Sequence, residues 1–189
     1  MKKLLFMPLI VALGIVCSLL SLNSCSKKSD AMPAATIGKA LYDTLGGTTL
    51  TVDPTHQGAM IEKGRLAIRN VIDSTIFVIA ADPKINSHFT ILLSEVGKGD
   101  LSGYTDLSEN LTTFVANATG AKDFIYIGLN MKDAHNPATN PRMNGKSTNA
   151  DFTEFETDLV AGANKNKVPQ SLINSLGKIV ESLRSVVVQ

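Results

Sequence analysis

The chain is 189 residues long and nearly balanced in charge, with 18 basic and 17 acidic side chains, two cysteines and three histidines. No basic run interleaved with aromatic residues occurs, which argues against nucleic-acid binding. The signatures of phosphate-binding loops, zinc proteases, thiol redox centres and serine hydrolases are also absent.

The N-terminal segment predicts export. Lys2 and Lys3 precede an almost wholly apolar stretch over residues 4–22, which is the pattern of a secretory signal. The stretch ends in Leu22-Asn23-Ser24-Cys25, which resembles the lipobox where bacterial signals are cut and the cysteine is acylated. An uncleaved membrane anchor is the alternative, because about 20 apolar residues can cross a bilayer.

We therefore expect a lipoprotein signal peptide over residues 1–24, a lipidated tether over 25–35 and one domain over 36–189. Acylated Cys25 would hold the protein on a lipid bilayer of the cell envelope, on the periplasmic or outer-membrane side. Without Lys2 and Lys3 the basic residues fall from 18 to 16 against 17 acids, so the mature net charge is −1. Cys17 leaves with the signal, and the domain then has no thiol for disulfide or metal chemistry.

Four segments repeat apolar residues at spacings of three and four, which predicts helices with one buried face. They cover residues 37–45, 68–79, 107–118 and 172–187. The β-branched run Thr75–Ile79 would suit a buried strand by propensity, but helical spacing back through Ile68 favours a helix. Thr48–Gly58 and Asn136–Asn149 are rich in turn residues and predict surface loops.

These patterns together predict an all-α domain. A further helix start is indicated by acids around Phe152 and Leu159, where they would form a solvated face that suits the helix dipole. These acids are Asp151, Glu154, Glu156 and Asp158. Paired catalytic carboxylates are the alternative interpretation of the same residues.

Several short strings, taken in order, resemble the truncated haemoglobins, and group 1 most closely. They are Ala40-Leu41-Tyr42-Asp43-Thr44-Leu45-Gly46-Gly47, Ala81-Asp82-Pro83-Lys84-Ile85-Asn86-Ser87-His88-Phe89, Tyr126-Ile127-Gly128 with Met131 and Ala134-His135, Thr148 with Phe152, and Val168-Pro169. The likeness covers most of residues 37–188. It implies a two-over-two helical sandwich with two loop insertions around a haem group, iron protoporphyrin IX.

The resemblance places His135 at the proximal iron ligand and Phe89 at the family's haem-packing position. Met131, one turn before His135, would help cover the haem face if that segment is helical. A neutral imidazole nitrogen is a good axial donor to haem iron, and its other N–H needs an acceptor that fixes the ring. Without the family pattern, His135 would be interpreted as an exposed loop histidine. Phe89 and Met131 would likewise suit an ordinary core.

The same alignment predicts an apolar distal side. Many group 1 members carry a tyrosine donor on the second helix, where this chain has Ile76, and the next helix presents Leu107 and Leu111. A shift of one residue would place Phe77 or Thr75 there, and only Thr75 could donate. Tyr104, one turn before Leu107, is an alternative donor. Losing a hydrogen bond worth about 1.5–3 kcal/mol would speed oxygen release roughly tenfold to a hundredfold.

The other polar groups leave two alternatives open. His56 or His88 could supply a second iron ligand, although His88 precedes Phe89 and is expected to point elsewhere. Arg142 or Lys146, in the insertion over residues 136–146, could neutralise haem propionates or remain solvated.

Three functions follow from the resemblance and its departures. The first is a haem protein that reversibly binds oxygen or another diatomic gas, NO or CO. The second is a haem enzyme or electron-transfer protein, such as one that removes nitric oxide, which would need a reductase as partner. The third is a globin-fold lipoprotein that has lost haem and serves as a binding module.

Overall fold

The structure, a computed structural model, describes residues 38–189, with side chains described from Leu41 onward. The predicted signal peptide, Cys25 and the tether lie outside these residues. The described part is mostly helical, which confirms the all-α prediction. Its elements are α1 (Gly38–Thr44), β1 (Leu50–Val52), β2 (Met60–Glu62), α2 (Lys63–Ala81), the 3-10 helix η1 (Asn86–Phe89), α3 (Thr90–Gly97), α4 (Ser102–Ala118), α5 (Met131–Ala134), α6 (Asn149–Lys165), α7 (Gln170–Glu181) and α8 (Arg184–Val187).

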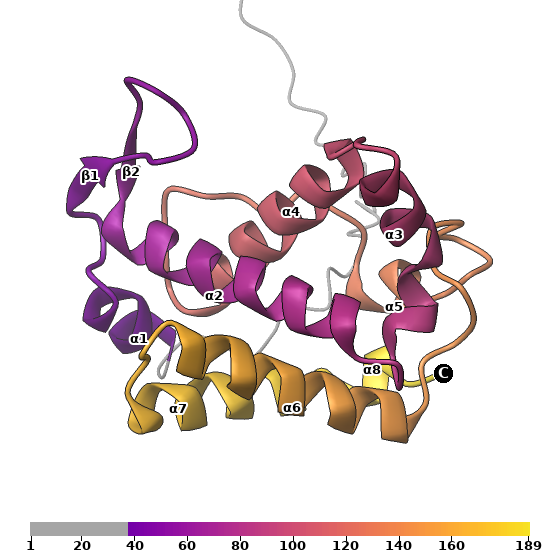
Figure 1. The fold of residues 1–189 in the computed structure, drawn as a ribbon. Coiled ribbons are helices and arrows are strands. Elements are labelled where there is room, and N and C mark those ends of the chain that lie inside the picture. The colour runs from indigo at the N-terminus through magenta and orange to yellow at the C-terminus, as the bar shows by residue number, and fades with distance from the viewer. Residues whose placement is uncertain (1–37) are drawn as a thin grey trace, which may run out of the picture.

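Helix α2 is the centre of the fold. It packs along α6 on one side and against α4 on the other, while α7 packs against α6 (Figure 1). Thr75–Ile79 lies inside α2, so the helical interpretation of that run is confirmed. The helix ends at Asp82, immediately before Pro83, which disfavours helical geometry in the residue that precedes it.

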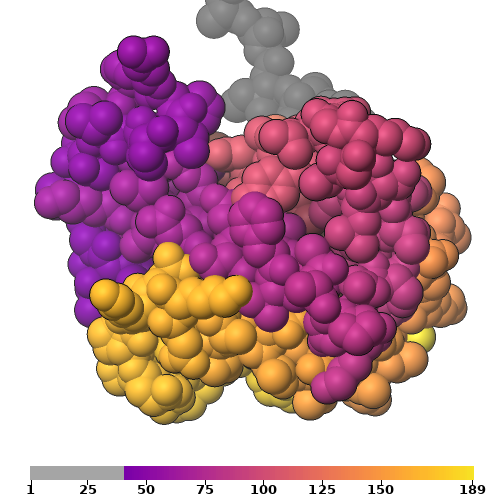
Figure 2. Space-filling model, viewed as in Figure 1, coloured from indigo at the N-terminus to yellow at the C-terminus, as the bar shows by residue number. Residues whose placement is uncertain are grey.

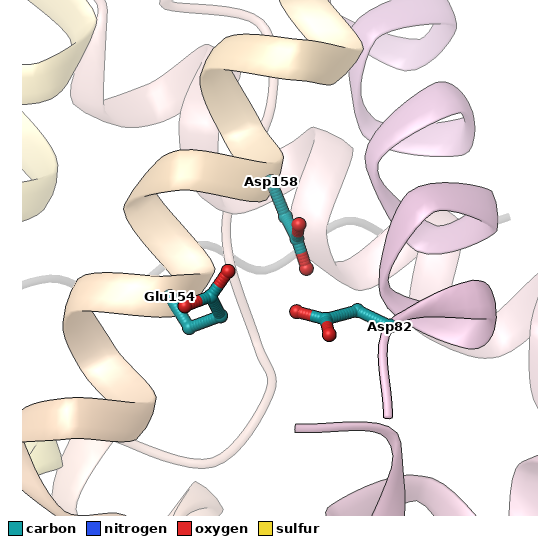
Figure 3. A group of neighbouring side chains, drawn as sticks. All are labelled: Asp82, Glu154 and Asp158. Atoms are coloured by element: carbon teal, nitrogen blue, oxygen red, sulfur yellow. The ribbon is translucent and has the colours of Figure 1, made fainter. Parts of the chain in front are cut away.

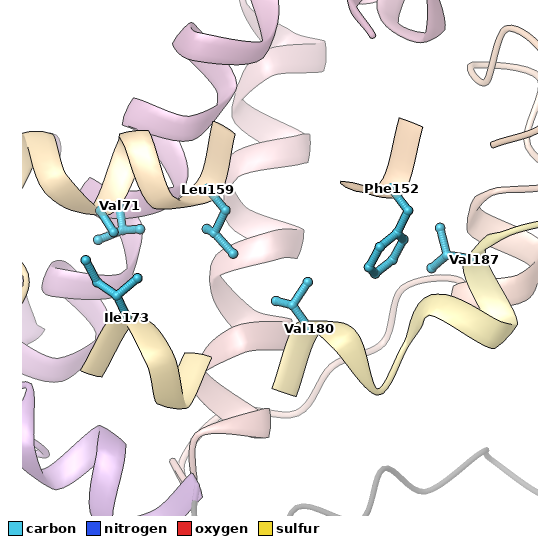
Figure 4. Packing of buried hydrophobic residues seen from close by; sticks show 7 residues of the cluster. Val71, Phe152, Leu159, Ile173, Val180 and Val187 are labelled. Carbon is cyan, nitrogen blue, oxygen red and sulfur yellow. The ribbon is translucent and has the colours of Figure 1, made fainter. Parts of the chain in front are cut away.

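Two hydrophobic clusters form the core on either side of α2. The first joins α6 to α7 and α8 through seven buried residues, most of them drawn in Figure 4: Val71, Phe152, Leu159, Ala163, Ile173, Val180 and Val187. The second joins α2 to α1, α4 and the segment after α4, and its buried members are Tyr42, Ile68, Ile72, Ile76, Ala116 and Ala121. Each cluster uses the apolar face that the sequence spacing predicts.

The predicted loop Thr48–Gly58 is partly wrong, because it contains strand β1, which pairs antiparallel with β2. The hairpin projects from the body of the molecule (Figures 1 and 2). Asp53, the first residue of the hairpin loop, ties the hairpin to α2: it is buried and accepts two hydrogen bonds from Arg69, at 2.7 and 3.2 Å. The strands are only three residues long and largely exposed, so their sequence carries little hydrophobic alternation.

The predicted last helix, residues 172–187, is divided into α7 and α8. At the break the Ser182 hydroxyl donates to the Ile179 carbonyl at 2.6 Å, and the Leu183 N–H bonds three residues back, to Val180. Such local side-chain bonds compete with the helical ladder. The change of direction lets Val187 reach the core beside Phe152 (Figure 4).

Within the described residues, no single helix is both long and apolar enough to cross a membrane. A broken pair made by α2 and the segment Asn86–Gly97 meets the length and composition requirements together, with a bend of 107° between its halves.

Candidate functional site

His135 ends the one-turn helix α5. Asn130 caps the start of this turn by accepting the Asp133 N–H at 2.9 Å, and the Nδ1 atom of His135 lies 2.8 Å from the Met131 carbonyl oxygen. Because a carbonyl can only accept, Nδ1 carries the proton and donates it. The lone pair of the imidazole therefore resides on Nε2.

No residue in the described part of the chain hydrogen-bonds to His135 Nε2. The ring is half-buried, and burial lowers the pKa of His135, with a further lowering from the nearby His88. The imidazole is therefore neutral at neutral pH, with an available lone pair and a fixed tautomer. This is the state in which histidine binds a metal ion.

The structure brings together the three residues predicted for the distal side. Ile76 is a buried member of the second cluster, and Leu107 and Leu111 pack against the same cluster from α4. Met131 packs instead against the first cluster, on the side of α5 that faces α8. Phe89 is half-buried at the end of η1. Met131 and the three predicted distal residues thus belong to different hydrophobic clusters.

The alternative distal donor, Tyr104, is engaged with a polar group that the sequence analysis missed. Burial and the adjacent carboxylate of Asp73 raise the pKa of Tyr104 to about 12. Asp73 also accepts the Ser108 hydroxyl at 2.5 Å, and the Tyr104 ring lies 5.7 Å from that of Phe77. The Tyr104 hydroxyl therefore faces the Asp73 carboxylate, so it is not free to act as the alternative distal donor.

The other histidines are committed elsewhere. His56 lies in the hairpin loop with a 65% exposed side chain, and its Nδ1 is 3.1 Å from Asp53. That loop is at the opposite end of the molecule from α5 (Figure 1). Both nitrogens of His88 have partners: the Asn144 carbonyl at 2.8 Å and the Asp151 carboxylate at 3.3 Å. A second iron ligand from either residue would require breaking these contacts.

The loop over residues 136–149 is anchored to the segment around η1 and α3. Arg142 makes a two-point ion pair with Glu95, at 2.9 and 2.5 Å, and Asn144 bonds to the backbone of Ser87. The Arg142 guanidinium is thus neither free for a propionate nor merely solvated. Lys146 is exposed.

A group of three carboxylates was also missed by the sequence analysis. Asp82, at the end of α2, faces Glu154 and Asp158 of α6, and one oxygen from each lies within 4.8 Å of the others (Figure 3). The interpretation of Asp151 as a helix-start acid is confirmed, because it forms a capping box with Thr148. For Asp158 the predicted solvated face is wrong, because its residue surface is only 5% exposed. It lies on the face of α6 that meets α2.

A small, wholly apolar pocket lies between α1, α2, α4 and the start of α7. Its lining includes Leu45, Val71, Leu172 and Leu176 and none of the six residues predicted to contact haem. It is a packing gap at the junction of the two clusters.

Comparison of the chain with protein-family models and with well-characterised proteins found no match.

Proposed function

We propose that this chain is a haem-binding protein of the truncated-globin type, in which His135 Nε2 is the axial iron ligand. The observation that carries the proposal is the state of His135: Nδ1 donates to the Met131 carbonyl at 2.8 Å, and Nε2 is left as a neutral donor atom. Bound haem would supply an iron centre able to hold a diatomic gas. The finer fold assignment, two helices over two, belongs to this proposal and is supported by the packing of α2 on α4 and of α6 on α7.

The residues present fit the group by their chemistry. The Met131–His135 hydrogen bond is the partner that an axial imidazole needs for a fixed orientation. Ile76, Leu107 and Leu111 are apolar side chains that pack in one cluster, and such side chains would suit contact with a macrocycle that has few polar edges. Phe89 and Met131 are half-buried apolar side chains.

The distal residues favour weak oxygen binding. Ile76, Leu107 and Leu111 carry no hydrogen-bond donor, and Tyr104 is directed to Asp73. Oxygen gains more from a donor than carbon monoxide or nitric oxide does. The absent bond, worth about 1.5–3 kcal/mol, corresponds to roughly tenfold to hundredfold faster oxygen release. We therefore favour a diatomic-gas binder whose oxygen affinity is low.

The test uses the full-length chain purified in detergent and reconstituted with haem. An intense Soret band that shifts with dithionite and again with carbon monoxide is expected, and His135→Ala should abolish the axial-histidine spectrum. His56→Ala is the matched control, because His56 is exposed in the distant hairpin. Absence of a Soret band in the wild-type protein would overturn the proposal in favour of a haem-free binding module. An unchanged spectrum in His135→Ala would overturn the assignment of His135 as the axial ligand.

The envelope location is part of the same proposal and has its own test. Cys25→Ala should abolish incorporation of labelled palmitate and move the protein out of the membrane fraction. Wild-type protein that incorporates no label would contradict acylation at Cys25.

A further inference from the structure

The three carboxylates Asp82, Glu154 and Asp158 are brought together by the crossing of two helices. Asp82 is the residue that ends α2, and Glu154 and Asp158 are one turn apart on α6. All three side chains point into one space between the helices (Figure 3). The convergence comes from residues more than 70 positions apart, and it is not a local run of acids.

Asp158 is the unusual member. The residue is 5% exposed, and neither of its carboxylate oxygens accepts a hydrogen bond from any described residue; Oδ2 is fully buried. Asp82 adds a second buried oxygen without a partner, its Oδ2, while its Oδ1 accepts the Lys84 N–H at 3.0 Å. A buried carboxylate oxygen without a donor or a counter-charge is destabilising. A cation bound between the two side chains would stabilise both of these oxygens.

The local charge is suited to a divalent ion. Lys84 is the cation that pairs with the group, through a 2.8 Å contact with Glu154, and its side chain is 67% exposed. Three carboxylates and one ammonium leave a net charge of −2. Asp82 also lies at the C-terminal end of the 19-residue helix α2, where the backbone dipole favours a cation and disfavours an anion.

Calcium suits this group better than magnesium does. Calcium accepts about six to eight oxygen ligands at about 2.3–2.6 Å in flexible geometry, whereas magnesium demands near-ideal octahedral geometry at about 2.0–2.1 Å. The three carboxylates come from two helices, and one oxygen of each lies within 4.8 Å of the others. An irregular group of this kind fits the more tolerant ion.

We propose that Asp82, Glu154 and Asp158 form a binding site for a hard divalent cation, Ca²⁺, which clamps the C-terminal end of α2 to α6. Water would complete the coordination from the partly exposed side of Asp82 and Glu154. The site is independent of His135 and of any haem.

The test is calcium titration of the full-length, haem-free chain in detergent after treatment with EDTA. Calorimetry with CaCl₂ should show saturable binding at one site. At a concentration of about 100 Kd, Ca²⁺ should raise the unfolding midpoint by roughly 5–10 °C. Asp158→Asn should weaken binding at least tenfold, whereas Asp123→Asn, which removes an exposed carboxylate outside the group, should leave it unchanged.

Glu154→Gln provides a second variant if Asp158→Asn does not fold, because Glu154 is partly exposed; it should also bind at least tenfold more weakly. The proposal is overturned if the wild-type protein shows no saturable calcium binding, or if the substituted proteins bind like the wild type. Equal or tighter binding of MgCl₂ would overturn the assignment to calcium.

Discussion

The closest approach of α2 and α6 depends on Gly162. A Cβ atom at this position would lie 2.3 Å from Thr75 Oγ1, 2.8 Å from Thr75 N and 3.0 Å from Thr75 Cα. Ordinary contacts between such atoms are about 3.5–4.0 Å. The Thr75 hydroxyl is held by its bond to the Val71 carbonyl at 2.8 Å, and the other two atoms are backbone. Gly162→Ala therefore forces the helices apart by roughly 0.5–1 Å.

Two opposing effects set the size of the change. Overpacking of this kind costs about 1–3 kcal/mol, and the loss should be at the upper end because backbone cannot rotate away. Replacing a helical glycine with alanine raises the free energy of unfolding by up to about 1 kcal/mol, because alanine has the higher helix propensity. We expect a net loss of about 1–2 kcal/mol in the free energy of unfolding for Gly162→Ala. Gly177→Ala in α7 meets no atom within 4 Å, so it should gain about 0.5–1 kcal/mol.

Urea denaturation of the haem-free proteins, followed by far-ultraviolet circular dichroism, measures both values. With a slope of about 2 kcal/mol/M, the two midpoints should differ by roughly 1 M or more. A Gly162→Ala protein as stable as Gly177→Ala would refute the contact argument, because both substitutions carry the same helix-propensity gain.

Three further changes test other parts of the fold. Arg69→Met leaves the buried carboxylate of Asp53 without its partner and should lower the free energy of unfolding by about 3–5 kcal/mol, measured by urea denaturation. Arg69 holds the pKa of Asp53 well below its usual range. The stability that this pair gives the wild-type protein should therefore persist above the unfolded pKa of about 3.9 and fade in stronger acid. Burial lowers the pKa of His135, so the unfolded chain takes up the proton at a higher pH than the folded chain does. The haem-free protein should therefore lose stability as pH falls below about 6.5. A His135→Leu protein whose melting temperature falls with pH as steeply as that of the wild type would contradict this. Thr148→Ala removes the capping box with Asp151 and should lower the unfolding free energy by about 1 kcal/mol, measured by urea denaturation; an unchanged value would mean that the cap contributes nothing.

The helices were predictable where one apolar face carries the packing. Ile68, Ile72 and Ile76 recur at helical spacing and lie buried in one cluster, and Asp82-Pro83 stops α2 by local geometry alone. His135 was also singled out from sequence, because few other reactive side chains exist in the domain. Apolar periodicity could not predict how the turns between helices are oriented.

The polar side of the α2–α6 crossing was not predictable by the same logic. Asp158, Gly162 and Asn166 follow one another at a spacing of four on α6, and this stripe meets α2. Asn166 donates to the Asn70 carbonyl at 3.0 Å and to Ser74 Oγ at 2.8 Å. A search for apolar periodicity assigns such a stripe to solvent. Only a paired pattern of small and polar residues on both helices could have indicated it.

The pairing of Asp53 with Arg69 was hidden for a different reason. The partners lie 16 residues apart, one in a hairpin loop and one on a helix, and the two strands of that hairpin are only three residues long, too short to show alternation. Nothing local in the sequence distinguishes this aspartate from a solvated turn residue.

Helix α5 contains a single turn, and an isolated turn of this length is not stable by itself. Its order derives from the Asn130 cap and from the chain's last residues, where Gln189 Nε2 donates to the Lys132 carbonyl at 2.7 Å. Such a segment opens at a lower free energy than the whole fold. A ligand that needs the ordered turn binds more weakly in proportion to the ordered fraction. If His135 binds haem as proposed, local unfolding of α5 and of the chain end that holds it would lower the affinity for haem. Haem binding should then slow amide exchange in α5 and at the C-terminus.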